Sequence, residues 1–420
     1  MKKITRSFQE SYPLDGYKPS VSTSFISTWL AVFHGMDLTF RGYVRENGVG
    51  VRNHVAVICT VGCASYAARR IVELNPRAKL VVHHQGCCHI PSDIAHVEKV
   101  LTNLALNPNV HSVLLVSMGC ESVSAEKIAD EVSKIKHIEV VRILDEGVVK
   151  AIEKGSEIVK EMLKESKKAK REEVDISELK LAIKCGGSDF TSGIISNPVA
   201  GKVADMIIEH GGTVIFGETT EVIGAEHILA KRGEKKEVSE KLLKLVREWE
   251  ESITAAGLDL RGGQPTPGNI RGGITTLEEK SIGAVCKAGS SKLVDVVDYG
   301  DLVNKKGLVF MHTPGREPEA LTGFSAGGAQ IILFTTGLGV PQGHPISPVI
   351  KISGNPETAR RLTEHIDVDL SKVFYGEESI EEAAKRVLDE IIEVASSKFT
   401  KSETIGYDDA VEIYIRGSVI

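Results

Sequence analysis

Side chains that can bind a metal or move a proton gather at turns that directly follow apolar runs of the sequence. The densest set is the segment 83–89 (HHQGCCH), at the end of the strand predicted for residues 79–83. Two further turns carry a carboxylate, at Glu121 and at Glu218. Imidazole and thiolate suit Fe(II) or Zn(II), whereas carboxylates suit Mg, Mn or Ca. These turns therefore indicate a metal site or an acid–base site.

The same side chains also have ordinary structural interpretations. The segment 83–89 can be buried cysteines beside one hydrogen-bonded histidine, and its spacing matches no closed zinc module. Glu121 and Glu218 can each be a first-turn glutamate that favours a helix dipole. Cys59 in mid-strand and Cys286 in a helix are expected to be small core residues.

The turn Cys185–Asp189 (CGGSD) is predicted to cradle an anion or carboxylate with backbone N–H groups and hydroxyls. The sequence contains no Walker pattern and no Gly-x-Gly-x-x-Gly fingerprint. Nucleotide binding is therefore not expected.

Strands and helices alternate on both sides of a polar segment, 165–177 (ESKKAKREEVDIS), which indicates a linker. A Gly- and Pro-rich loop is expected at 256–275. The predicted fold class is α/β, with two consecutive mainly parallel α/β units of Rossmann-like strand–helix alternation, at 41–165 and 178–420. Because open parallel sheets bind ligands beyond the carboxyl ends of their strands, we expect the site between the two units.

Residues 1–40 carry no clear period and are predicted to be an N-terminal arm outside the fold. One hypothesis is that residues 1–35 reflect start-codon choice, because Met36 comes directly before the first organised segment.

The composition excludes several functional classes. The chain has 420 residues and a formal net charge of −6, which gives nucleic-acid binding no electrostatic support. No apolar run reaches the roughly 18 residues of a membrane span. Seven cysteines, an odd number spread over a large chain, favour a reducing compartment over a disulfide framework. We therefore expect a cytoplasmic protein that binds neither nucleic acid nor membrane.

Several long motifs resemble the altronate/galactarate dehydratase family of hydro-lyases. They run in order from residue 42 almost to the C-terminus: GYVRENGVGVRNHVAVICTVGC (42–63), HHQGC (83–87), LLVSMGCE (114–121), KCGGSDFTSGIISNP (184–198), GGTVIFGETTEVIGAEHIL (211–229), GNIRGGITTLEEKSIGAVCKAG (268–289) and FTTGLGVPQGHPISPVIKISGNP (334–356).

The resemblance implies dehydration of a sugar acid, an aldonate such as altronate or an aldarate, to a 2-keto-3-deoxy acid. It also implies a divalent metal, Fe(II) first, with Mn(II), Mg(II) or Ca(II) as alternatives. A related member, the large subunit of sulfolactate sulfo-lyase, eliminates sulfite instead. Many relatives carry a small β-rich substrate-binding domain where this chain has only about forty unrelated residues. We therefore expect either a separate small β-rich subunit or a different reaction, and a homo-oligomer.

Dehydration next to a carboxylate needs a base for the C2 proton and an acid that helps water leave from C3. A metal bound to the carboxylate stabilises the developing enediolate and can polarise the departing hydroxyl. The candidate residues, each a hypothesis, are His83, Cys87 and Glu121 for the metal; Glu218, His312 and His344 for acid–base catalysis; and Arg45, Arg52, Ser188, Asp189, Asn269 and Thr336 for the substrate. The two arginines can clamp a carboxylate bidentately or be ordinary surface residues.

Two other classes stay open at this point. One is a hydrolase or lyase that uses Cys63 or Cys87 as a nucleophile. The other is a non-catalytic partner subunit that only binds acids.

Overall fold

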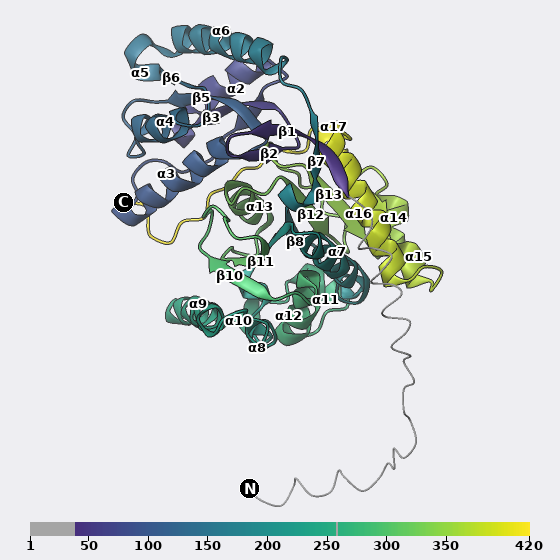
Figure 1. The fold of residues 1–420 in the computed structure, drawn as a ribbon. Helices are drawn as coiled ribbons and strands as arrows, with labels where there is room; N and C mark the ends of the chain where they lie inside the picture. The colour runs from purple at the N-terminus through teal and green to yellow at the C-terminus, as the bar shows by residue number, and fades with distance from the viewer. Residues whose placement is uncertain (1–37, 258) are drawn as a thin grey trace, which may run out of the picture. The chain divides into compact units, whose positions relative to one another are not determined.

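The computed structural model describes residues 38–257 and 259–420, whose arrangement is shown in Figure 1. The predicted arm of residues 1–40 lies outside the described residues as far as residue 37, whereas Thr39 and Phe40 already belong to strand β1 (Thr39–Arg45). Residues Thr39–Ile420 form one compact unit. None of its described helices is both long and apolar enough to cross a membrane.

The first sheet has four parallel strands in the order β4–β3–β5–β6. Its elements are β3 (His54–Cys59), α2 (Ser65–Glu73), β4 (Lys79–Val81), α3 (Pro91–Leu106), β5 (Val110–Ser117), α4 (Ala125–Ser133), β6 (Ile138–Arg142), α5 (Ile143–Glu146) and α6 (Val148–Ser166). Val55, Val57 and Cys59 of β3 pack with α2 and α6, while Ala56 and Ile58 pack with α3 and α4. A strand covered on both faces needs apolar residues throughout, which explains the unbroken run after His54.

The second sheet has seven parallel strands in the order β10–β11–β9–β8–β12–β13–β14. These strands are β8 (Lys180–Cys185), β9 (Thr213–Phe216), β10 (Leu293–Val297), β11 (Gly307–Met311), β12 (Ile331–Thr335), β13 (Val349–Ser353) and β14 (Val368–Asp369). The chain runs outward from β8 through β9 to the β10 edge and returns through α13 (Glu317–Ala326) to β12, on the other side of β8. This reversal creates a crevice beyond the carboxyl ends of β8 and β12, where such sheets bind ligands.

Helices connect these strands and cover the sheet (Figure 1). The remaining helices are α7 (Asn197–Glu209), α8 (Glu226–Ala230), α9 (Lys236–Ala255), α10 (Leu260–Gly263), α11 (Pro267–Arg271), α12 (Leu277–Val285), α14 (Pro356–Arg361), α15 (Ser371–Phe374), α16 (Ile380–Ser396) and α17 (Lys401–Ile405). Short helices α10 and α11 occupy the stretch that the sequence predicts to be a loop, because Pro267 suits a first helical turn and Thr266 caps it.

A third, antiparallel sheet joins β1 to β2 (Gly48–Gly50) on one side and to β7 (Glu172–Asp175) on the other. Strand β7 lies inside the predicted linker 165–177. Its side chains are mostly exposed, so the apolar pattern of a core strand is missing, and pairing with β1 alone makes it a strand.

The two parallel sheets share apolar packing. Tyr299, Ala326 and Ile346 belong to the same buried cluster as the side chains of α3. The side-chain amide of Asn109 donates to the carbonyls of Gln330 and Ile346 across the junction. The predicted α/β class with two consecutive parallel units is therefore confirmed, and their strand ends are held in a fixed relation.

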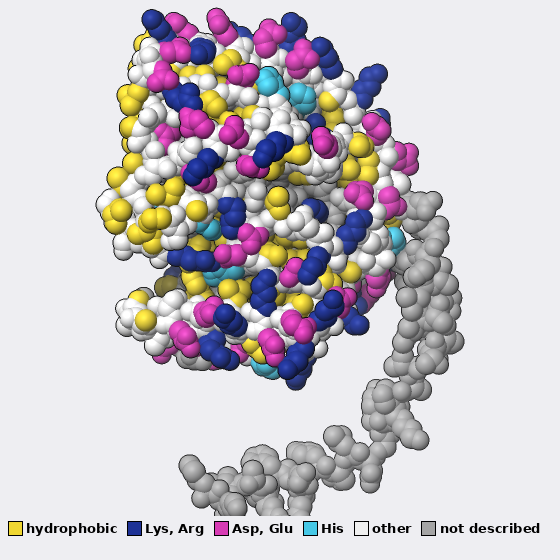
Figure 2. Space-filling view, turned by 60° about the vertical axis from the view of Figure 1, so that its left-hand side comes forward, with side chains coloured by type: hydrophobic (Ala, Val, Ile, Leu, Met, Phe, Trp, Pro, Cys, Tyr) yellow, Lys and Arg dark blue, Asp and Glu magenta, His cyan; other side chains and the backbone are white. Residues whose placement is uncertain are grey.

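Acidic and basic side chains are interspersed over the face of the described residues shown in Figure 2. Nucleic-acid binding uses a clustered basic surface, and this face does not offer one.

Candidate active site

Two adjacent strand ends bring charged and thiol side chains together at the carboxyl edge of the seven-stranded sheet. Strand β8 ends in Lys184 and Cys185, and Gly217-Glu218 directly follows β9. Glu218 has a φ of 72°, in the left-handed region that a non-glycine residue seldom adopts. Backbone strain of this kind collects at functional sites, where the surrounding contacts maintain it.

The Glu218 carboxylate is buried between two lysines. Its Oε1 pairs with Lys184 Nζ and its Oε2 pairs with Lys287 Nζ, and none of the three side chains is more than 1% exposed. The backbone N–H of Cys185 also donates to Oε2, at 3.1 Å. Burial raises the pKa of Glu218, and the nearby charge of Glu221 raises it further. The two ammonium groups oppose this shift and compensate for burying the charge.

Glu221 lies in the 3₁₀ turn η4 (Thr219–Glu221) and completes this charge cluster, which we define as Lys184, Cys185, Glu218, Glu221, Lys280 and Lys287. Its Oε1 lies 3.1 Å from Lys280 Nζ, and its Oε2 accepts a hydrogen bond from Cys185 Sγ at 2.8 Å. Burial alone would raise the pKa of Glu221, but the charges of Lys280, Lys287 and Lys184 hold that pKa below its usual range.

The charges of the cluster are matched by a further carboxylate. Burial raises the pKa of Cys185, and the charges of Glu218 and Glu221 raise it further. Burial alone would lower the pKa of Lys184, but the carboxylates of Glu218 and Glu317 raise it, so three ammonium groups face three carboxylates. Of the three ammonium groups, that of Lys280 lines a neighbouring cavity.

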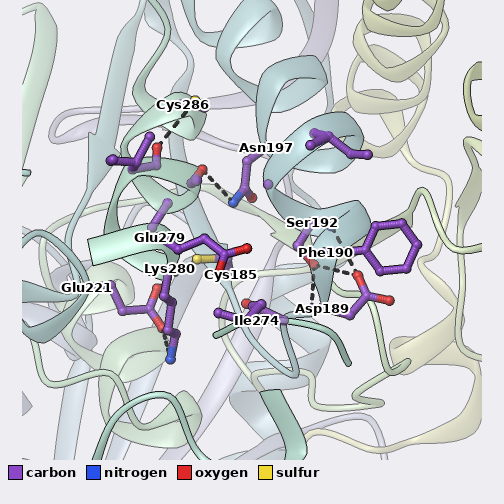
Figure 3. A pocket seen from close by; sticks show the side chains of 16 residues that line it. Cys185, Asp189, Phe190, Ser192, Asn197, Glu221, Ile274, Glu279, Lys280 and Cys286 are labelled. Atoms are coloured by element: carbon purple, nitrogen blue, oxygen red, sulfur yellow. Dashed lines mark hydrogen bonds and ion pairs between the residues drawn. The ribbon is translucent and has the colours of Figure 1, made fainter. Parts of the chain in front are cut away.

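A cavity of about 240 Å³ opens beside the charge cluster (Figure 3). It is lined by Cys185 of β8, Glu221 of η4 and Lys280 of α12, and by Asp189 and Phe190 from the segment after β8. A small acid in this cavity would meet a thiol and an ammonium group beside the carboxylates of Asp189, Glu221 and Glu279.

Asn269, predicted to hold a substrate, connects two parts of the cavity wall. Its Nδ2 donates to the carbonyl of Ser188 at 2.8 Å, and its Oδ1 accepts from Lys280 Nζ at 3.2 Å. Ser188 itself lines the cavity. Asn269 is thus placed to position Lys280 against the Ser188 turn.

Asp189 and Thr336, also predicted to hold a substrate, shape the turns around the cavity. Asp189 Oδ1 accepts from the hydroxyl of Thr191 at 2.6 Å, and Oδ2 accepts from Asn355 Nδ2 at 2.7 Å. Thr336 Oγ1 accepts from the backbone N–H of Gly339 at 3.0 Å. These oxygens already have partners within the protein.

The structure separates the three predicted acid–base residues. His312 Nδ1 lies 2.7 Å from Thr219 Oγ1, and its ring lines a different cavity, of about 530 Å³, with Trp249. Burial lowers the pKa of His312 to about 4. His344 precedes β13 and so lies at the opposite, amino-terminal edge of the sheet, where burial lowers its pKa to about 3. Only Glu218 belongs to the charge cluster.

Comparison with known proteins agrees with this architecture. The family described as D-galactarate/altronate dehydratase, C-terminal, matches residues 176–417, and the one described as D-galactarate dehydratase/altronate hydrolase, second domain, matches residues 42–167. The chain is 34% identical over 376 residues to altronate dehydratase of Bacillus subtilis (strain 168), which covers 87% of this chain and 75% of that protein. The chain belongs to the galactarate/altronate dehydratase family.

Two further relatives of the dehydratase family differ in their named reactions. The chain is 36% identical to (2R)-sulfolactate sulfo-lyase subunit beta of Chromohalobacter salexigens, over 89% of this chain and 96% of that protein. It is 32% identical to galactarate dehydratase (L-threo-forming) of Escherichia coli (strain K12), over 86% of this chain and 73% of that protein. The family is enzymatic and its named members are lyases, so the family and the enzyme class predicted from the sequence are confirmed.

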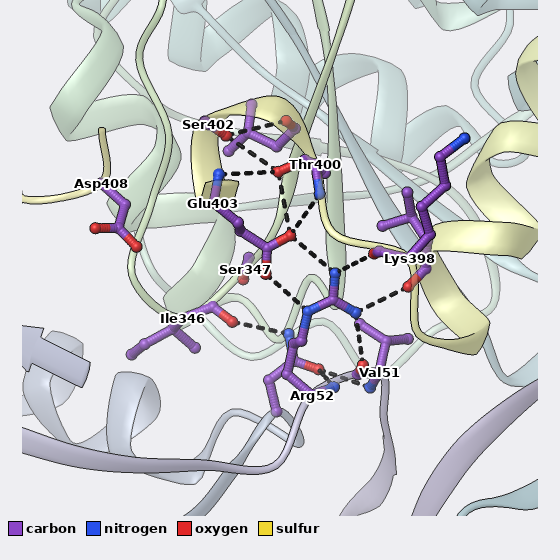
Figure 4. Close-up of polar contacts among 12 residues, drawn as sticks. Val51, Arg52, Ile346, Ser347, Lys398, Thr400, Ser402, Glu403 and Asp408 are labelled. Atoms are coloured by element: carbon purple, nitrogen blue, oxygen red, sulfur yellow. Dashed lines mark hydrogen bonds and ion pairs between the residues drawn. The ribbon is translucent and has the colours of Figure 1, made fainter. Parts of the chain in front are cut away.

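The two predicted substrate arginines have partners inside the protein. Arg52 is 4% exposed and does bind a carboxylate bidentately, but the carboxylate is that of Glu403, at 2.7 and 2.8 Å (Figure 4). Its other donors bind the carbonyls of Val51, Val394 and Lys398. Arg45 donates to the carbonyl of Pro108 at 2.8 Å. The structure therefore places neither side chain at the cavity of the charge cluster.

The three predicted metal ligands lie at the carboxyl edge of the four-stranded sheet. His83 uses both ring nitrogens locally, with Nε2 2.9 Å from the carbonyl of Cys59 and Nδ1 accepting from the N–H of Gln85. Glu121 accepts from Ser117 Oγ at 2.7 Å and from the N–H of Gly119 at 2.6 Å. With Cys87, they do not form a group of ligand atoms all within 4.8 Å.

In the described part of the chain, one group of three candidate ligands does meet that distance: Cys185, Glu218 and Glu221. A thiolate with two carboxylates is a chemically suitable donor set for Fe(II). However, Lys287 Nζ lies 3.0 Å from Cys185 Sγ and 3.6 Å from Glu221 Oε2, and it contacts Glu218 Oε2. A lysine ammonium group thus fills the position that a divalent ion would need. As arranged, these residues do not fit a metal.

Sequence reasoning missed most of the charge cluster. Lys184 follows three apolar residues inside β8, and Lys287 follows a run of small residues in GAVCKAG. A lone charge inside an apolar segment is the signal that could have identified both, because such a charge must find a buried partner. Glu221 and Lys280 carry no comparable signal.

Proposed function

We propose that this member of the dehydratase family removes water from a sugar acid, an aldonate such as altronate or an aldarate, and yields a 2-keto-3-deoxy acid. The supporting observation is a cavity beside the charge cluster that is lined by Lys280, Cys185 and Glu221 together. A substrate carboxylate in contact with the Lys280 ammonium group would be stabilised by its positive charge.

Lys280 is the residue assigned to the substrate carboxylate. Removing the C2 proton places negative charge on that carboxylate, so contact with an ammonium group becomes stronger as the reaction proceeds. Glu221 and Asn269 hold the Lys280 ammonium group in place at 3.1 and 3.2 Å.

Cys185 and Glu218 are the residues assigned to proton transfer. Cys185 lines the cavity, and its Sγ lies 3.6 Å from Glu218 Oε2. The raised pKa of Glu218 suits exchange of a proton nearer to neutral pH than that of an ordinary glutamate. Lys287, in contact with both groups, stabilises whichever of them is ionised.

A substrate screen tests the proposal. The purified protein is incubated with aldonates, aldarates and sulfolactate, and keto acid and sulfite are measured. We expect keto-acid release from at least one sugar acid, with loss of that activity in Glu218→Gln. Lys202→Met, which alters an exposed pair with Glu381, is the matched control. Sulfite release without keto-acid formation from any sugar acid would reject the dehydratase assignment.

Sulfolactate elimination is the second candidate function. The match covers 96% of (2R)-sulfolactate sulfo-lyase subunit beta but 75% of the Bacillus altronate dehydratase. The same residues would serve it, because sulfite leaves from the carbon next to the one that loses its proton. The screen above distinguishes the two reactions by the product released.

We also propose that a separate small, β-rich subunit completes the enzyme, as the word subunit in that relative's name suggests for the relative. Turnover measured with and without a candidate small subunit tests this. Full activity of the chain alone would reject it.

The resemblance also implies a divalent metal, with Fe(II) first. Because Lys287 fills the centre of the Cys185, Glu218 and Glu221 group, we assign no step of the reaction to a metal there. Activity after dialysis against a chelator, with Fe(II), Mn(II), Mg(II) or Ca(II) restored one at a time, measures whether a metal is required.

A further inference from the structure

Three neighbouring strands of the four-stranded sheet each lead into a Gly-Cys pair. Gly62-Cys63 follows β3, Gly86-Cys87 follows β4 and Gly119-Cys120 follows β5. Strand β3 lies between the other two, and all three are parallel. Parallel strands end at the same edge of a sheet, so the three cysteines are presented at one edge.

The pairing register of β3 and β5 relates the cysteines that follow these two strands. Cys59 of β3 is paired with Val116 of β5. Cys63 and Cys120 lie equally far beyond these partners, since 59 to 63 and 116 to 120 are both four positions. Cys63 and Cys120 thus lie in the segments that follow two adjacent strands paired in this register.

Backbone hydrogen bonds fasten the three turns to one another. The N–H of Gly62 donates to the carbonyl of Gln85 at 3.1 Å, and the N–H of Ser122 donates to the carbonyl of Gly86 at 3.1 Å. A Cβ atom at Gly86 would lie 2.2 Å from the carbonyl oxygen of Thr60. Only glycine permits this approach, which brings the turn carrying Cys87 against the end of β3.

Side chains around the cysteines hold the same turns. The Glu121 carboxylate accepts from the hydroxyl of Thr60 on the β3 side and from Ser117 and Gly119 on the β5 side. His89 Nε2 accepts from the N–H of Gly86 at 3.1 Å. These hydrogen bonds fix the positions of the turns that carry the thiols.

The thiols themselves are accessible. Cys63 and Cys120 are exposed and Cys87 is half-buried, whereas Cys59 in the same sheet is fully buried. Accessible thiols are vulnerable to oxidation, so two exposed thiols and one half-buried thiol at one edge indicate that sulfur ligands are used there.

The distances between the three sulfur atoms distinguish a site for a single metal ion from a site for a polynuclear cluster. A single tetrahedral zinc ion, with Zn–S bonds of about 2.3 Å, holds its sulfurs roughly 3.8 Å apart. Cys63, Cys87 and Cys120 do not meet a 4.8 Å limit for all pairs, so at least one pair of sulfurs is farther apart. A polynuclear iron–sulfur cluster spans a wider gap between its thiolate ligands.

We propose that Cys63, Cys87 and Cys120 bind an iron–sulfur cluster at the carboxyl edge of the four-stranded sheet. Each thiol loses its proton and each sulfur binds one iron, and the cluster's remaining position takes a ligand from outside this trio. The site shares no residue with the charge cluster and does not depend on the proposed dehydration.

The test is iron and acid-labile sulfide per chain, with visible absorption, in the full chain purified without oxygen from iron-replete cells. We expect both elements in the wild-type protein. Cys63→Ala, Cys87→Ala and Cys120→Ala should each lower the acid-labile sulfide at least about tenfold, because loss of even a residue that only supports a metal ligand lowers metal affinity about 10- to 100-fold. Thermal unfolding of each variant shows whether it folds like the wild-type protein. Because these positions are largely exposed, the substitutions should change the unfolding temperature little.

Two variants make the result specific. Cys88→Ala removes the neighbouring thiol, 3.7 Å from Cys87 Sγ, and should keep the sulfide. Cys185→Ser alters the charge cluster and should also keep it. Absence of acid-labile sulfide from the wild-type protein, zinc as the bound metal, or equal loss in Cys88→Ala and Cys87→Ala would overturn the proposal.

Discussion

Lys287 and Glu218 form an ion pair that is closed to water, with exposed fractions of 1% and 0%. Lys287 lies in the 3₁₀ turn η5 (Cys286–Ala288) that follows α12, and Glu218 follows β9, so the two residues are 69 positions apart in the sequence. The same ammonium group contacts Cys185 at 3.0 Å. Removing one member of such a pair leaves an uncompensated buried charge.

We therefore expect Lys287→Met to lower the free energy of unfolding by about 3 kcal/mol or more. Urea denaturation at neutral pH measures this. Lys202→Met, at an exposed lysine paired with Glu381, should change the stability by less than about 0.5 kcal/mol. Equal effects of the two substitutions would mean that the Lys287–Glu218 pair is not buried as described.

Lys280→Met should mainly impair turnover. Lys280 lines the cavity and bonds Glu221, Gln264 and Asn269, so its loss removes the positive charge nearest to the substrate carboxylate. We expect kcat/KM for the acid identified in the screen to fall about a hundredfold or more. Lys280→Arg should recover part of that loss. An unchanged kcat/KM in Lys280→Met would place the substrate elsewhere.

The Arg52–Glu403 pair should make stability depend on pH. Burial alone would raise the pKa of Glu403, but the hydrogen bonds and charge of Arg52 hold it below the ordinary value of 4.5. A carboxyl group whose pKa is depressed in the folded state contributes stability that is fully present above its unfolded pKa and is lost as pH falls through its folded pKa.

In urea denaturation, wild type should accordingly exceed Glu403→Gln in stability at pH 6, and the gap should narrow below about pH 4.5, the ordinary value. Glu357→Gln, in an exposed pair with Arg360, serves as the comparison. A gap that stays constant down to pH 3 would show that Glu403 is not held ionised by Arg52.

Gly201→Ala should disturb the charge cluster by displacing the backbone turn that carries Lys287. A Cβ atom at Gly201 in α7 would lie 2.1 Å from the carbonyl oxygen of Cys286, so η5 and with it Lys287 must move. We expect a loss of about 1–3 kcal/mol in unfolding free energy together with reduced kcat. Gly263→Ala, where nothing lies within 4 Å of the added atom, should have neither effect.

The α/β class was predictable because it depends on local patterns. The run after His54 is apolar at every position, as a strand covered on both faces must be, and helical segments follow each such run. Strand β7 was missed because it is held by pairing with β1 and buries almost nothing.

Part of the candidate site was also predictable. Glu218, Ser188 and Asp189 lie at or beside the cavity, as expected from the rule that parallel sheets bind ligands at the carboxyl ends of their strands. That rule does not distinguish one sheet from another, so it favours Glu121 as well as Glu218, although only Glu218 joins the charge cluster.

The tertiary structure decided which charged residues pair with each other in the interior. Arg52 is matched with Glu403, 351 positions away, and Lys287 with Glu218 and Cys185, 69 and 102 positions away. No local pattern encodes such pairs, because the energy of a buried charge depends on the groups that folding brings around it. The sequence alone determined the family, the alternation of elements and the strand ends that carry chemistry. The tertiary structure decided which of those ends form one site, since only packing removes water and makes the charges pair with each other.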